Sequence, residues 1–208
     1  RFGPADAGVG DGHAAAEPGV VGGAARVALE QVALEHRADD GRLGVALLVF
    51  APIGYLLVDA GAALAALLTG GVMLWLAMLP DVDHRLPVVS HRGVTHSLLF
   101  AAAVGAAFAA VGVALVEVGG DTLAAELLGL DALGIGVVPF GFTLGFLAVT
   151  SHLLGDLLTP AGVNLFWPLP QEFSLYVTRA DNTVANYGLF LLGVFAVGTA
   201  GAFALGVA

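Results

Sequence analysis

Residues 132–160 read ALGIGVVPFGFTLGFLAVTSHLLGDLLTP and combine a long apolar run with a polar ending. Ala132–Ser151 has 20 residues and no charge, and a helix needs about 20 apolar residues to cross a bilayer core. His152 and Asp156 follow four residues apart, so both side chains lie on one helical face. Because small residues let membrane helices approach closely, this face predicts contact with another helix. The small residues that extend it are Gly141, Gly145, Ala148 and Gly155.

Four other stretches of the chain also lack charge. They are Gly44–Val58 with 15 residues, Ala60–Leu79 with 20, Leu98–Val116 with 19 and Asn182–Ala208 with 27. Together the five stretches predict an all-α polytopic membrane protein with about five transmembrane helices. The first stretch is short and contains Pro52, so a buried or re-entrant helix is the alternative there.

The composition supports this fold class and excludes several others. Apolar residues make up 58% of the 208 residues and charged residues 12%, whereas soluble domains average about 25% charged residues. The chain has no cysteine, which excludes disulfides and thiolate metal sites. Its net charge of −10 argues against a nucleic-acid scaffold as partner. The acidic, lysine-free composition is halophile-like, because it also suits a high-salt cytoplasm.

The arginines predict the orientation in the membrane. With five spans, the segments 1–42, 80–96 and 156–181 share one side and hold all seven arginines. The opposite side receives Asp59 and the acidic loop 117–131. Positive charge is favoured on the cytoplasmic side. We therefore expect an integral cell-membrane protein whose N-terminus and polar motifs face the cytoplasm.

Two parts of the chain differ in character. Residues 1–41 form a Gly/Ala-rich arm, which we expect to be mobile apart from a short helix over 24–36. Residues 42–208 are expected to form a helical membrane domain. Its polar motifs lie at 80–97 and 151–168.

A second polar cluster lies between the second and third uncharged stretches. It comprises Pro80-Asp81-Val82-Asp83-His84 and His91-Arg92-Gly93-Val94-Thr95-His96-Ser97. Neutral imidazole and carboxylate are ligands for zinc, manganese or iron, and they are costly to bury without a cation. We predict a divalent metal, zinc in the first place and manganese in the second. The expected ligands are His91, His96, His152 and Asp156.

Other polar residues are expected around this metal. Asp81 and Asp83 are the candidate catalytic residues, at a second metal position or as general base. Residues that could support a ligand or contact the substrate are His84, Arg92, Thr95 and Ser97. Arg92 could alternatively anchor the topology instead of binding an anionic group.

Plainer interpretations exist for the same residues. His152 and Asp156 could be a hydrogen-bonded pair that ties their helix to a neighbour. Asp81 and Asp83 could mark the end of a span, since Pro80 already stops a helix. Each of these alternatives predicts a polar cluster without a metal.

The motifs together resemble the YdjM-like family of membrane-bound metal-dependent hydrolases. The resemblance covers roughly residues 42–170 and implies a helical membrane protein with a His/Asp metal centre. More distantly, the pattern is similar to zinc-dependent phospholipases C, which implies phosphodiester or phospholipid substrates. The chain departs from the family at Gly41-Arg42, where a Gly-His pair is usual. A guanidinium stays protonated and cannot ligate a metal.

These observations predict a membrane-bound hydrolase that uses a metal-activated water. Its partners would be the lipid bilayer and a small-molecule or lipid substrate. The alternative is a non-catalytic membrane protein with a structural or degenerate metal site, because Arg42 stands where a histidine is expected. A transporter fits less well, since transport sites lie near the bilayer midplane. Here the ionisable residues gather at one end of the spans.

Overall fold

The computed structural model describes residues 18–81 and 93–207. The chain divides into two compact units, residues 1–35 and residues 36–208, which we describe separately. The described part of the first unit is helical and belongs to α1 (Pro18–Asp59), which starts earlier than the helix expected over 24–36. Proline is favoured at the first position of a helix because it has no N–H to leave unpaired. The mobility expected for the arm 1–41 stays a prediction.

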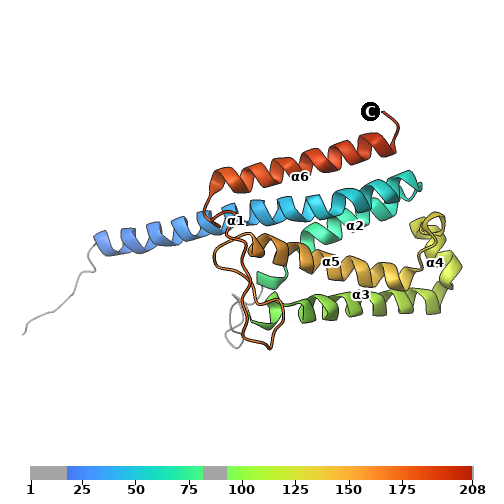
Figure 1. Cartoon of the computed structure of the whole chain (residues 1–208), viewed down its shortest axis with the longest axis horizontal. Helices are drawn as coiled ribbons and strands as arrows, with labels where there is room; N and C mark the ends of the chain where they lie inside the picture. The colour runs from blue at the N-terminus through green and yellow to red at the C-terminus, as the bar shows by residue number, and fades with distance from the viewer. Residues whose placement is uncertain (1–17, 82–92, 208) are drawn as a thin grey trace, which may run out of the picture. The chain divides into compact units, whose positions relative to one another are not determined.

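The second unit contains the remaining helices (Figure 1). After α1 they are α2 (Ala63–Leu76), α3 (Leu98–Gly119), α4 (Asp121–Leu128), α5 (Val137–Leu157) and α6 (Thr183–Ala204). Short 3-10 helices, η2 (Val94–His96) and η3 (Asp131–Leu133), precede α3 and α5. In the described part of the chain, extended pairing is limited to one isolated bridge between Val163 and Phe173.

Among the described residues, four helices are long and apolar enough to cross a membrane. They are Asp39–Asp59 within α1, Leu98–Gly119, Val137–Leu157 and Thr183–Ala204, each of 21 or 22 residues. The predicted all-α membrane fold is therefore confirmed. The first span, expected to be the shortest, has full length because α1 continues through the polar residues before Gly44 and accommodates Pro52.

The second predicted span is the one that differs. Ala60–Leu79 was expected to form a spanning helix, but α2 has only 14 residues. Gly61 has a φ of 80° and turns the chain between α1 and α2, which removes the first residues from the helix. At 1.5 Å per residue α2 measures about 21 Å, short of the roughly 30 Å bilayer core. It still brings the chain back to the end of the bundle where the first span begins, because Asp81, after α2, contacts Arg42 near that start.

Small residues bring α3 and α5 together, and Figure 1 shows the two helices side by side. A Cβ added to Gly145 would lie 2.9 Å from the Val104 carbonyl oxygen. A Cβ added to Gly141 would lie 2.7 Å from the Phe108 carbonyl oxygen. The small-residue face predicted from the sequence therefore packs against the backbone of α3.

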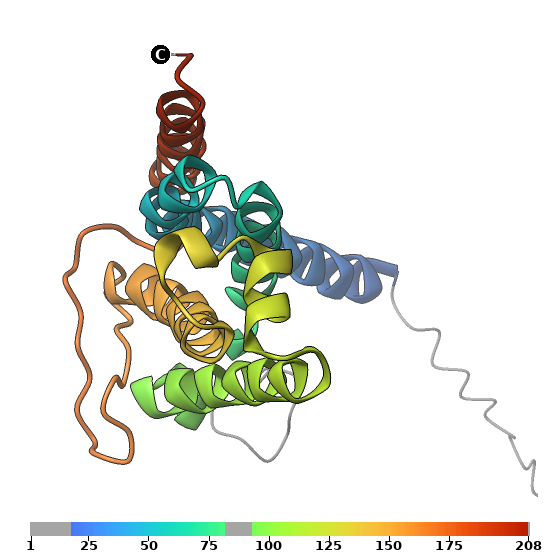
Figure 2. The same cartoon turned by 90° about the vertical axis from the view of Figure 1, so that its right-hand side faces the viewer.

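The segment between α5 and α6 lies at the same end of the bundle as the start of α3. Figures 1 and 2 show it as an extended excursion beside these helices. The Leu98 amide donates to the Leu165 carbonyl, and Val163 pairs with Phe173. Large apolar side chains stay exposed along this segment, as an interfacial position favours. They are Phe166, Trp167, Leu169, Leu175, Tyr176 and Val177.

Candidate metal centre

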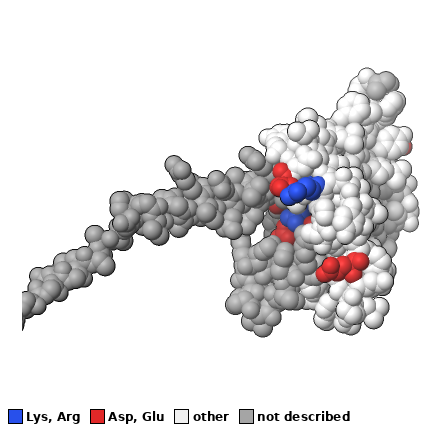
Figure 3. Space-filling model, turned by 60° about the vertical axis from the view of Figure 1, so that its left-hand side comes forward, with Lys and Arg blue, Asp and Glu red and all other residues white. Residues whose placement is uncertain are grey.

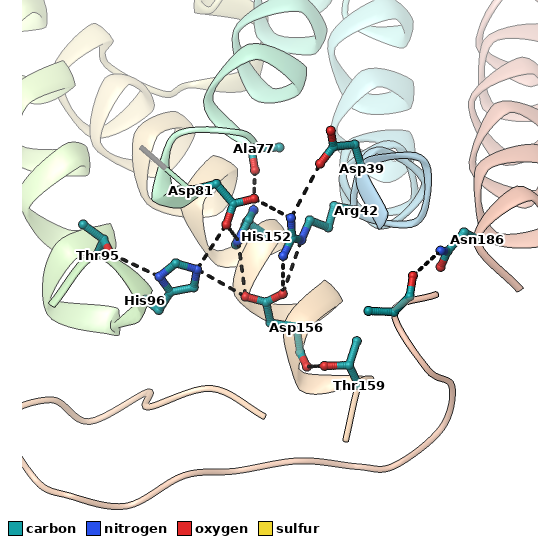
Figure 4. Close-up of polar contacts among 11 residues, drawn as sticks. Asp39, Arg42, Ala77, Asp81, Thr95, His96, His152, Asp156, Thr159 and Asn186 are labelled. Carbon is teal, nitrogen blue, oxygen red and sulfur yellow. Dashed lines mark hydrogen bonds and ion pairs between the residues drawn. The ribbon is translucent and has the colours of Figure 1, made fainter. Parts of the chain in front are cut away.

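Side chains from separate elements converge at one end of the second unit (Figure 4). Asp81 follows α2, and His96 ends η2. His152 and Asp156 project from the last turns of α5. His96 and His152 are 0% exposed and Asp156 is 1% exposed. These four residues, called the ligand cluster below, join three segments that are distant in sequence.

The ligand cluster directs two imidazole nitrogens at two carboxylate oxygens. His96 Nε2 lies 3.4 Å from Asp81 Oδ1 and 3.4 Å from Asp156 Oδ2. His152 Nε2 lies 3.6 Å and 3.3 Å from the same two oxygens. One donor atom from each of Asp81, His96 and His152 lies within 4.8 Å of the others. Three donors therefore surround one small volume, and Asp156 Oδ2 lies within 3.4 Å of both imidazole nitrogens.

These donors fit a divalent metal ion. Neighbouring ligands of a zinc ion at bonds of about 2.0–2.1 Å lie roughly 3.3–3.4 Å apart, and each of the two carboxylate oxygens lies 3.3–3.6 Å from the two imidazole nitrogens. Among the described residues, three buried atoms that could bind a metal lack a hydrogen-bond partner: Asp81 Oδ1, His152 Nε2 and Asp156 Oδ2. Buried polar atoms without partners are unfavourable, and a cation between them would satisfy all three.

Backbone and side-chain contacts orient both imidazoles. His152 Nδ1 lies 2.6 Å from the Ala77 carbonyl oxygen. A carbonyl only accepts, so Nδ1 carries a proton and Nε2 faces the cluster. His96 Nδ1 lies 3.1 Å from Thr95 Oγ1. Such outer contacts fix the ring orientation of metal-binding histidines.

The Arg42 guanidinium lies against the ligand cluster. Its Nη2 donates to Asp156 Oδ1 at 2.9 Å, and its Nη1 pairs with Asp81 Oδ2. Asp39, three residues earlier on the same helix, lies 3.6 Å from Nη1. Burial alone would raise the pKa of Asp81, but the neighbouring His96 and Arg42 outweigh burial and lower that pKa below its usual value. Asp81 is therefore ionised at neutral pH.

A recess adjoins these charges. Figure 3 shows several acidic and basic side chains around one hollow on a mostly uncharged surface. A cavity of about 20 Å³ is lined by Arg42, Asp156 and Asn186, among others. A cavity of this size holds about one water molecule. The end of the site near α6 is thus accessible to water.

The structure places the predicted site residues unequally. His96, His152, Asp156 and Asp81 come together, and Thr95 contacts His96. Ser97 instead caps α3, where its hydroxyl accepts from the Phe100 amide and donates to the Val94 carbonyl. The remaining predicted residues lie outside the described residues: Asp83, His84, His91 and Arg92.

Sequence reasoning missed three participants. The departure at Arg42 was recognised, but its insertion between the two carboxylates was not expected. Asp39 shares the face of Arg42 at a spacing of three, which was a readable signal. The Ala77 carbonyl left no signal, because any residue type offers a backbone oxygen.

Comparison with known proteins matches the sequence to one family. The family described as "YdjM inner membrane protein" matches residues 41–208. The Inner membrane protein YdjM of Escherichia coli (strain K12) is 34% identical over 137 residues, which cover 58% of this chain and 60% of that protein. The Shigella flexneri protein of the same name gives the same values. The match thus spans less than two thirds of these relatives' length, and no solved structure matches the chain.

Proposed function

We propose that this chain, which belongs to the YdjM inner membrane protein family, is a membrane-bound hydrolase that depends on a divalent metal. One observation carries the proposal. Two imidazoles and two carboxylates turn buried nitrogen and oxygen atoms towards one another, with nitrogen–oxygen separations of 3.3–3.6 Å. Zinc suits this donor set best, and manganese is the second choice.

The residues of the ligand cluster have different proposed roles. When bound, a divalent cation polarises the scissile group and lowers the pKa of a coordinated water. His96, His152 and Asp156 are the residues that would hold such a cation. Asp81 is the more exposed carboxylate, at 17% of its side chain against 2% for Asp156. Its Oδ1 lies beside both imidazoles, which makes Asp81 the group placed to accept a proton from the attacking water.

The position of the site supports a substrate from the membrane surface. The ligand cluster lies where α5 ends, next to the segment with exposed Phe166, Trp167 and Tyr176. Aromatic side chains gather at membrane–water interfaces. Phosphodiesters and phospholipid head groups are the substrate class that we propose. All seven arginines lie in the segments on the side of the polar motifs, which favours a cytoplasmic position for the site.

Metal content tests the proposal first. The protein is purified in detergent, reconstituted with zinc or manganese, and analysed by elemental mass spectrometry. We expect stoichiometric metal in the wild type and its loss in His152→Ala and Asp156→Asn. Asp59→Asn is the matched control. Asp59 is an exposed carboxylate at the end of the first span, Asp39–Asp59, that lies away from the ligand cluster. A wild type without metal after reconstitution would refute the proposal.

A structural metal site is the second candidate. The cluster and Arg42 together connect α1, α5 and the residues after α2, so a bound ion would also hold these elements together. This alternative predicts stoichiometric metal, no turnover of phosphodiesters or phospholipids, and a lower melting temperature without the ion. Turnover by the wild type that Asp81→Asn abolishes without loss of metal would decide for the hydrolase.

A further inference from the structure

Arg42 and the imidazoles use different oxygens of the same two carboxylates. Asp156 turns Oδ1 to the guanidinium and Oδ2 to the imidazoles. Asp81 turns Oδ2 to the guanidinium and Oδ1 to the imidazoles. Each carboxylate therefore already has a cation on its outer oxygen, and only the inner oxygen is available to a metal.

The fold makes room for the Arg42 side chain. A Cβ added to Gly155 would lie 3.1 Å from Arg42 Cγ, which is tighter than an ordinary contact. The Arg42 side chain is 14% exposed, and two of its nitrogens contact Asp156. A fork-shaped donor in a fitted slot holds its partners more firmly than a flexible surface cation does.

The charges of the described cluster favour one divalent ion over two. Asp81 and Asp156 against Arg42 leave a formal charge of −1 when both imidazoles are neutral, as metal ligands must be. One divalent cation brings this sum to +1, and a second would bring it to +3 in a cluster whose histidines are 0% exposed. Buried charge without a counter-charge is strongly unfavourable.

We propose that Arg42 is a resident cation that takes the place of a second metal ion and limits the site to one. The inference rests on the proposed metal site and adds its stoichiometry. The guanidinium fixes the two carboxylates and supplies the positive charge that a second ion would otherwise bring.

Manganese counting tests this limit. The full chain in detergent is loaded with excess Mn²⁺, desalted, and measured by elemental mass spectrometry and electron paramagnetic resonance. We expect one ion per wild-type chain with the spectrum of an isolated ion. Arg42→His and Arg42→Gln release both outer oxygens and remove the charge. We expect two ions per chain in these variants, with the spin coupling of ions about 3.5–4 Å apart.

Two variants serve as controls. Arg42→Lys keeps a positive charge and should retain one ion. Arg179→His changes an arginine that also pairs with a carboxylate, Asp181, but is 78% exposed, and it should retain one ion as well. If Arg42→His does not fold, Arg42→Gln and the wild-type count still decide.

The outcomes separate the inference from the proposed function. Two ions on the wild type would overturn the limit set by Arg42 and leave the metal site intact. One ion on folded Arg42→His and Arg42→Gln would overturn it as well. No ion on the wild type would overturn the proposed function, and the inference with it.

Discussion

Gly155 shows how one missing side chain shapes the site. Its neighbour Asp156 belongs to the ligand cluster, and a Cβ added to Gly155 would lie 3.1 Å from Arg42 Cγ. Gly155→Ala should push the Arg42 side chain aside and loosen its hold on Asp156. We expect metal affinity to fall roughly 10- to 100-fold, as for other residues that orient metal ligands. Metal titration monitors the change.

The matched control for this substitution is Gly188→Ala. Gly188 is also helical, and a Cβ added there meets nothing within 4 Å. It should leave metal affinity unchanged. Equal affinities for the two alanine variants would contradict the fitted slot for Arg42.

Thr95 and Ser97 separate two roles that look alike in the sequence. Thr95 Oγ1 contacts His96 Nδ1, whereas Ser97 caps α3. Thr95→Val should therefore weaken metal binding roughly tenfold. Ser97→Ala should lower the free energy of unfolding by about 1 kcal/mol and leave metal binding unchanged. Metal titration and thermal unfolding of both variants check this, and the reverse pattern would refute it.

The sequence predicted the residues of the site better than their contacts. His152 and Asp156 could be paired from their spacing alone, because four residues make one helical turn. The approach of Asp81 and His96 to them depends on how α2 and α3 pack on α5, which no local pattern encodes. Arg42 was discounted because it cannot ligate a metal, although it could still bind the ligands.

At the scale of elements, backbone contacts between α3 and α5 hold the ligands of α5 near His96. Gly145→Ala would place a methyl group 2.9–3.1 Å from backbone atoms of Val104 and Gly105, which cannot move aside like a flexible side chain. We expect unfolding to become easier by about 1–3 kcal/mol, as for other overpacked interfaces. Thermal unfolding in detergent measures it.

Gly198→Ala is the control for the helix interface. Gly198 lies in α6, and a Cβ added there meets nothing within 4 Å. Its effect should stay within about 0.5 kcal/mol. A similar loss in both variants would show that the α3–α5 contact is not specific.

Helix lengths mark the limit of prediction at this scale. Counting uncharged residues located the apolar segments, since burial in lipid excludes charge. It did not locate the helix ends. The first helix continues through Asp39–Leu43, where Asp39 and Arg42 pair their charges. Gly61 delays the start of α2 within the uncharged stretch Ala60–Leu79, because its positive φ turns the chain.

For the whole molecule, we expect a bound metal to stabilise the fold by connecting segments that are distant in sequence. An ion present at about 100 times its dissociation constant stabilises the folded state by about 2.7 kcal/mol, so chelation should lower the melting temperature by roughly 5–10 °C. His152→Ala should melt at the same temperature with and without chelator. A wild type whose melting temperature ignores both chelator and added metal would contradict a metal shared by these segments.

The orientation of the molecule can be tested with introduced cysteines, since the chain has none of its own. Glu172 lies in the segment beside the ligand cluster, and Asp121 lies at the far end, where α4 begins. Both are exposed carboxylates, so Glu172→Cys and Asp121→Cys form a matched pair.

The described arginines Arg42 and Arg179 lie at the cluster end of the spans, whereas the far end carries acidic residues. Because positive charge is retained in the cytoplasm, a membrane-impermeant thiol reagent added to intact spheroplasts should label Asp121→Cys. It should label Glu172→Cys only after the membrane is opened. The reverse pattern would place the site outside, and labelling of both from one side would contradict the arrangement of the spans.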